Sequence, residues 1–109
     1  LPYKDVGESR RPTLTWPREI PVKSEGPSEV VAMAEDYLKW LQTSPNVPKL
    51  YIEADPGALT DIMGNIATAL PNLKKVVVKG LHFIQEDSPD EIGKFISQFL
   101  KDQVSGTKL

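Results

Sequence analysis

The chain has 109 residues, of which 39% are hydrophobic and 26% charged, and its formal net charge is -2 at pH 7. This composition is typical of one small globular domain, and the slight negative charge argues against nucleic acid as a partner. The sequence has no cysteine, no visible signal peptide and no apolar run near the roughly 18 residues of a membrane span, so we expect a cytoplasmic protein without disulfides or a membrane partner.

Residues 1–27 are rich in proline and charge, which breaks any long helix or strand. The stretch 10–21 nevertheless carries too many apolar side chains for a simple linker. We therefore expect irregular chain draped over a partner surface, with a short helix before Pro12. We also expect Leu1 to continue an upstream polypeptide, because the segment does not resemble a natural N-terminus.

A first helix is predicted to open at Pro27 and to close at Pro45. Proline suits the first helical position, and Glu29 suits the first turn. One apolar stripe recurs at helical spacing and consists of Val30, Ala34, Tyr37, Leu38 and Leu41.

Two strands and two further helices are predicted downstream. The strands are Lys49–Ala54 and Lys74–Lys79, and the second has a centre of three valines suited to a buried parallel strand. A helix over about 60–70 separates them. A last helix opens at 88–91, where serine, proline and glutamate fit a capping box, and its polar tail after Lys101 is predicted to fray.

The order helix, strand, helix, strand, helix predicts an α/β fold built on a parallel βαβ unit. Two parallel strands are too few to stand alone, because parallel sheets need neighbours and cover on both faces. We therefore expect the end of a larger doubly wound sheet. Burial in so small a sheet hardly exceeds the ordering entropy, so the isolated chain is expected to be partly folded or to aggregate through open strand edges.

The single histidine, His82, follows the predicted strand end at Lys79. Functional groups gather at the carboxyl ends of strands in open α/β sheets, and a neutral imidazole can take a proton from water at neutral pH. His82 is therefore a candidate general base. The alternative is a histidine that hydrogen bonds merely hold in place.

Asp55, at the end of the other predicted strand, also has two interpretations. It is either an acid that orients the histidine or the start of an Asp-Pro-Gly turn.

The sequence has no Gly-rich phosphate loop, no strand-nucleophile-helix turn and no metal-ligand spacing, so we expect neither a metal nor a cofactor. The acids at 86–91 suit a helix N-terminus. The sequence therefore shows a candidate general base, His82, but no recognisable nucleophile motif.

Three segments carry apolar side chains that could converge beside His82. Plain packing explains any one of them, but as a set they suit an apolar substrate site. The candidate pocket residues are Trp16, Pro17, Ile20, Ala58, Leu59 and Phe83.

These segments resemble one family over essentially the whole chain. Residues 10–21 are similar to the end of the cap domain of subfamily II haloalkane dehalogenases and Renilla-type luciferases, 55–60 to the dehalogenase loop after the seventh strand, and 82–93 to the catalytic-histidine loop and last helix. The resemblance implies the C-terminal portion of an α/β-hydrolase, with two parallel strands and three helices. Residues 1–22 would be the end of the helical cap and 23–109 part of the core.

The resemblance is divided between the two groups. Lys79–Phe83 lean towards the luciferases, whereas Ile84 and the pair Ala58 and Leu59 lean towards the dehalogenases, since the luciferase pattern has two aromatics at 58 and 59. Such a mosaic suggests a reconstructed ancestor or an engineered hybrid of the two.

The family mechanism implies roles for the matching residues. An aspartate nucleophile displaces halide and forms an alkyl-enzyme ester, His82 activates the water that hydrolyses the ester, and Pro17 lines the halide pocket. A glutamate after the sixth strand orients the histidine, which favours the turn for Asp55. The nucleophile, that glutamate and the tryptophan and asparagine that bind halide would all precede Leu1.

Two classes of function stay open. The chain is a fragment of a haloalkane dehalogenase, active only with the missing N-terminal part and on an apolar haloalkane, or of a luciferase that oxidises a coelenterazine-like substrate on the same scaffold. Alternatively, it is an inactive fragment or complementation module that binds the N-terminal half through its sheet edge and apolar faces.

Overall fold

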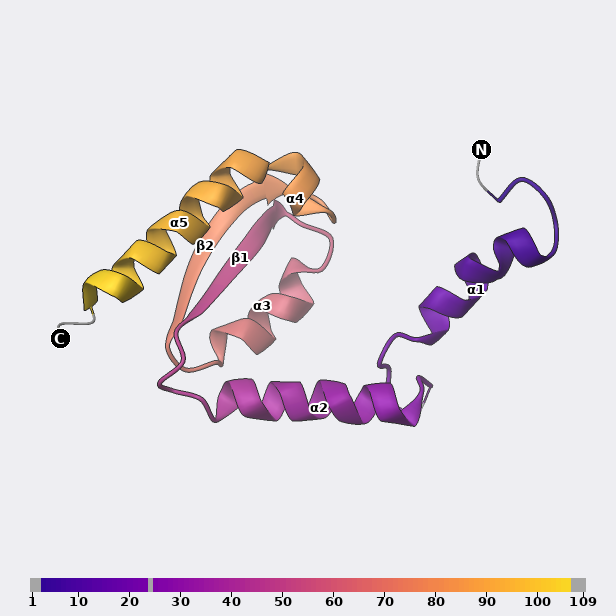
Figure 1. Cartoon of the computed structure of the whole chain (residues 1–109), viewed down its shortest axis with the longest axis horizontal. Coiled ribbons are helices and arrows are strands. Elements are labelled where there is room, and N and C mark those ends of the chain that lie inside the picture. Colours follow the sequence, from indigo (N-terminus) through magenta and orange to yellow (C-terminus); the bar gives the residue numbers. More distant parts are fainter. Residues whose placement is uncertain (1–2, 24, 107–109) are drawn as a thin grey trace. The chain divides into compact units, whose positions relative to one another are not determined.

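The computed structural model of the chain describes residues 3–23 and 25–106 (Figure 1). Its internal contacts divide the chain into two compact units, Leu1–Leu41 and Gln42–Leu109. No helix among the described residues is long and apolar enough to cross a membrane.

The first unit is helical. A 3-10 turn, η1 (Glu8–Arg10), runs directly into α1 (Arg11–Arg18). The short helix expected before Pro12 is confirmed by η1, whereas the irregular chain expected beyond it is wrong, because Pro12 lies in the first turn of α1. Proline is tolerated there, since the first amide groups of a helix have no acceptor within it.

The helix α2 (Ser28–Gln42) confirms the predicted first helix. It begins one residue later than predicted, and the Pro27 carbonyl accepts a hydrogen bond from the Val31 amide at 3.0 Å. Four residues of the predicted apolar stripe are half-buried, whereas Tyr37 is 64% exposed. An exposed ion pair joins Lys23 to Glu35 at 3.8 Å.

The second unit is a two-stranded parallel sheet with helices on both faces (Figure 1). β1 (Lys49–Pro56) pairs with β2 (Leu73–Gly80) without a bulge, from the first residue of each strand to the last. The crossover helix α3 (Thr60–Thr68) lies on one face and α5 (Pro89–Gly106) on the other. The predicted order of strands and helices is thereby confirmed.

Two features of the last third differ from the prediction. A one-turn helix, α4 (Ile84–Asp87), lies where a loop was expected. The helix α5 continues to Gly106 instead of fraying after Lys101, and a hydrogen-bonded ion pair of 2.8 Å between Lys74 of β2 and Asp102 anchors its last turns. Residues 107–109 of the predicted tail lie outside the described residues.

The three central valines of β2 do not form a uniformly buried run. Val78 is 4% exposed and Val77 is 49% exposed, because successive residues point to opposite faces. Lys74, on the face of Val78, reaches α5, so α5 covers that face. The other face of β2 is less well covered, since Val77 on that face stays half exposed.

A buried lysine closes the amino end of the sheet. Lys49 is 8% exposed, and its Nζ donates to the carbonyls of Ser44 at 2.7 Å, Val47 at 3.0 Å and Pro71 at 3.1 Å. The Lys49 amide donates to the Asn72 carbonyl at 2.9 Å. One side chain therefore ties together the turns that precede both strands, at the end of the sheet opposite to His82.

Candidate active site around His82

His82 lies in the loop between the carboxyl end of β2, at Gly80, and α4. Its imidazole is exposed and meets the ring of Phe83 edge-on, with 4.7 Å between ring centroids and 83° between ring planes. Among residues 3–23 and 25–106, no side chain forms a hydrogen bond or ion pair with this imidazole. The described residues therefore include no side chain that orients the His82 imidazole through a hydrogen bond.

The loop after β1 lies beside the histidine loop and is hydrogen-bonded to it. The amides of Gly57 and Ala58 donate to the carbonyls of Gly80 and Leu81, each at 3.0 Å. Gly57 has φ +64, and a Cβ there would collide with the Thr60 hydroxyl, which donates to the Ala54 carbonyl. The tight turn that follows β1 therefore requires glycine and carries Ala58 to the histidine loop.

Two side chains that sequence reasoning did not assign to the site hold the other side of this loop. Oδ2 of Asp87 accepts a hydrogen bond from the Leu81 amide at 2.9 Å. The hydroxyl of Ser88, which is 5% exposed, donates to the Lys79 carbonyl at 2.6 Å. The capping-box pattern had singled out Ser88 as a helix cap, but nothing in the pattern indicated that its hydroxyl reaches back to β2.

A hollow of about 200 Å³ adjoins the imidazole. Its wall is mainly apolar and includes His82 together with Ala58, Leu59, Met63 and Tyr51. The structure thus brings two of the predicted pocket residues, Ala58 and Leu59, to the histidine. Phe83 contacts the imidazole directly but does not line this hollow.

Tyr51 is the lining residue of the hollow whose pKa is shifted. Burial raises the pKa of its phenol, and the charge of the Glu53 carboxylate raises it further, although Lys75 opposes the shift. The Nζ of Lys75 lies 2.6 Å from Oε2 of Glu53. At neutral pH the phenol therefore keeps its proton, and its hydroxyl donates a hydrogen bond to the Glu53 carboxylate.

The other predicted wall residues belong to the first unit. Trp16 and Pro17 lie in α1, and Ile20 follows it; Trp16 is 75% exposed and Ile20 54% exposed. Because His82 belongs to the second unit, the role of Trp16, Pro17 and Ile20 at the histidine stays a prediction.

Asp55 is the second-last residue of β1, and its peptide bond to Pro56 is cis. Its side chain is exposed and borders a different hollow, together with Lys79 and Asp87. No hydrogen bond joins it to His82 within the part of the chain that the structure describes. The described residues also contain no cluster of three or more His, Asp or Glu side chains that could hold a metal ion.

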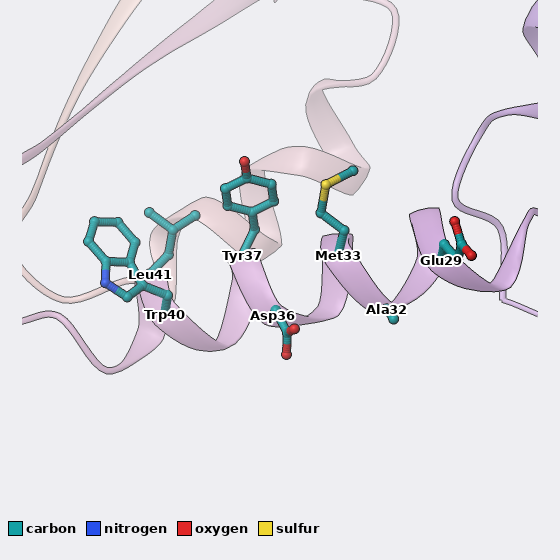
Figure 2. Close-up of a pocket in the computed structure, with 7 residues that line it drawn as sticks. All are labelled: Glu29, Ala32, Met33, Asp36, Tyr37, Trp40 and Leu41. Atoms are coloured by element: carbon teal, nitrogen blue, oxygen red, sulfur yellow. The ribbon is translucent and has the colours of Figure 1, made fainter.

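A second hollow runs along α2 in the first unit (Figure 2). Met33, Tyr37 and Leu41 project from the same side of the helix, with Trp40 at its end. The two carboxylates that border the hollow, Glu29 and Asp36, have no histidine or nucleophile beside them among its lining residues. The surface is apolar and lacks the groups for catalysis, so the hollow at His82 is the better candidate for chemistry.

No protein-family model matches the sequence, but several curated proteins do. The chain is 52% identical over 101 residues to a haloalkane dehalogenase of Sphingobium indicum, covering 92% of this chain and 33% of that protein. It is 48% identical over 100 residues to a coelenterazine h 2-monooxygenase of Renilla reniformis, covering 92% and 32%. It is 46% identical over 110 residues to a haloalkane dehalogenase of Mycolicibacterium smegmatis, covering 99% and 35%.

Among solved structures, the chain is similar to a mutant haloalkane dehalogenase from Agrobacterium tumefaciens. The TM-score is 0.68 at 36% sequence identity, and the match covers 85% of this chain and 32% of that one. This chain therefore spans about a third of the length of the curated relatives it matches. The chain is homologous to the C-terminal region of haloalkane dehalogenases and of Renilla luciferase, and its two strands and helices form a C-terminal portion of the α/β-hydrolase fold.

Proposed function

We propose that the chain is the C-terminal part of a haloalkane dehalogenase-like hydrolase and that His82 is its general base. The observation that carries the proposal is the position of His82: an exposed imidazole at the carboxyl end of a parallel strand, beside a mainly apolar hollow. The 52% identity to a haloalkane dehalogenase supports the same chemistry. Apolar walls suit a small haloalkane, which offers no hydrogen bonds to recognise.

The proposed reaction has two steps. A carboxylate nucleophile attacks the carbon that bears the halogen, halide leaves, and an alkyl-enzyme ester forms. His82 then takes a proton from water, and the resulting hydroxide attacks the ester carbonyl. The bond from the acyl carbon to the alkoxy oxygen breaks, the alcohol is released as the carboxylate re-forms, and His82 gives its proton to solvent. In this scheme Ala58 and Leu59 hold the apolar part of the substrate, and Pro17 lines the halide pocket with Trp16 and Ile20 nearby.

The remaining groups are proposed to lie in an N-terminal partner. The nucleophile, the acid that orients His82 and the two halide donors are absent from this chain, which matches its coverage of about a third of its relatives. In this proposal residues 1–22 complete the partner's cap and 23–109 complete its core. The isolated chain is then inactive, because no carboxylate among the described residues lines the hollow at His82 to form the ester.

The test is complementation. The chain is mixed, or joined covalently, with the N-terminal two thirds of the Sphingobium dehalogenase, and halide release from a short haloalkane is measured. We expect turnover that disappears in His82→Phe and persists in Glu86→Gln, a matched change at an exposed residue of the adjacent helix. Assembly without halide release would contradict the proposal and favour a non-catalytic complementation module.

Oxidation of a coelenterazine-like substrate by O2, without a cofactor, is the second candidate. It is supported by the 48% identity to a coelenterazine h 2-monooxygenase. Ala58 and Leu59 weigh against it as the main activity, since two aromatics take these positions in the luciferase pattern. To separate the candidates, light emission and halide release of the complemented protein are measured before and after Ala58 and Leu59 are both changed to Phe. If the scaffold is a luciferase, this double variant should emit more light and release less halide.

A further inference from the structure

We propose that Asp87 is a positioning residue for His82: its carboxylate fixes the backbone that carries the imidazole to the hollow. The catalytic consequence rests on the proposed role of His82 as general base, whereas the positioning itself rests on the geometry of the loop.

Three successive peptide groups that precede His82 are held by hydrogen bonds. The Lys79 carbonyl accepts from the Ser88 hydroxyl at 2.6 Å. The next peptide group is held twice, because the Gly80 carbonyl accepts from the Gly57 amide at 3.0 Å and the Leu81 amide donates to Oδ2 of Asp87 at 2.9 Å. The third is the Leu81 carbonyl, which accepts from the Ala58 amide at 3.0 Å.

Asp87 is the single charged member of this set of acceptors and donors. Hydrogen bonds to an ionised group are about twice as strong as neutral ones, so Asp87 is expected to contribute most to holding the loop. The Leu81 side chain is 64% exposed, so packing of that side chain does little to fix the loop. Without the carboxylate, the Leu81 amide would face water, and this peptide group would keep only the hydrogen bond from the Gly57 amide to the Gly80 carbonyl.

The absence of a side chain at Gly80 makes the close approach of Asp87 possible. A Cβ at Gly80 would lie 2.9 Å from Oδ2 of Asp87 and 3.0 Å from Cγ2 of Ile84. The helix α4 therefore packs directly over the backbone of Gly80. Gly80 thus leaves the space that Asp87, at the end of α4, needs to reach the Leu81 amide.

The first experiment measures the Leu81 amide and the His82 imidazole by NMR in the complemented protein, with the isotope label carried only by the 109-residue chain. Because His82 is the only histidine of the labelled chain, its ring signal needs no assignment. In Asp87→Ala we expect the Leu81 amide to exchange on the order of 10- to 100-fold faster and the ring signal to broaden or split. Asp87→Asn keeps an acceptor oxygen and should restore most of the protection. Glu86→Ala removes the neighbouring acid of α4 and should leave both signals unchanged.

The outcomes separate the positioning from the proposed function. A Leu81 amide that is unprotected in the parent chain, or equally protected in Asp87→Ala, overturns the positioning. In the complemented protein, halide release should fall by a similar factor in Asp87→Ala and recover in Asp87→Asn. If the parent shows no turnover while Leu81 protection still follows residue 87, the proposed function fails and the positioning stands.

Discussion

Replacement of the buried Lys49 by methionine should strongly destabilise the second unit. Its ammonium donates to three carbonyls, those of Ser44, Val47 and Pro71, over 2.7–3.1 Å. Methionine fills much of the space of the lysine stem but donates no hydrogen bond. Three carbonyls in a partly buried region therefore lose their partner, and the turns before both strands lose their common tie.

The magnitude follows from two opposing effects. Each buried acceptor that is left unpaired costs about 1–3 kcal/mol, while removal of a buried ammonium relieves its desolvation. Water can reach some of the exposed turn, which lowers the cost further. We expect a net loss of about 2–4 kcal/mol in the free energy of unfolding, which is a large fraction of the stability of a small domain.

The assay is urea unfolding of the complemented protein, followed by far-ultraviolet circular dichroism. Lys94→Met is the matched control, since Lys94 is exposed and has no hydrogen bond or ion pair among the described residues. We expect a lower midpoint for Lys49→Met, and a free energy of unfolding within about 0.5 kcal/mol of the parent for the control. Equal midpoints for the two variants would refute the assignment of Lys49 as the tie between the turns.

Three further predictions concern stability. A hydrogen bond from Lys74 lowers the pKa of Asp102. The stabilisation that Asp102 contributes is therefore present above its unfolded pKa of about 4 and is lost as pH falls through the lower folded value. Asp102→Asn should flatten the dependence of the unfolding free energy on pH over that range. Gly80→Ala should cost about 1–3 kcal/mol by overpacking against Asp87, whereas Gly93→Ala, where a Cβ meets nothing within 4 Å, should stabilise α5 slightly; equal melting temperatures would contradict this contrast. The isolated chain should melt without a cooperative transition, and a two-state calorimetric melt of the monomer would show that the two strands are stable by themselves.

Much of the fold could be predicted from local pattern. Period-2 and period-3.6 spacing of apolar residues, together with the prolines and glycines between the segments, located both strands and their helices to within a few residues. The same pattern placed His82 just beyond the carboxyl end of a parallel strand. One failure came from proline: the helix α1 was missed because Pro12 was treated as a helix breaker, although it lies in the first turn, where its missing amide costs nothing.

The sequence by itself determined the order of the strands and helices, the parallel pairing that a crossover helix requires, and the position of the histidine at a strand end, because these depend on local periodicity and chain connectivity. The tertiary structure alone decided which backbone groups the polar side chains reach. Lys49 meets Pro71, 22 residues away, and Asp87 turns back to the Leu81 amide. Such contacts depend on where the backbone returns in space, and neither residue type nor spacing encodes that return.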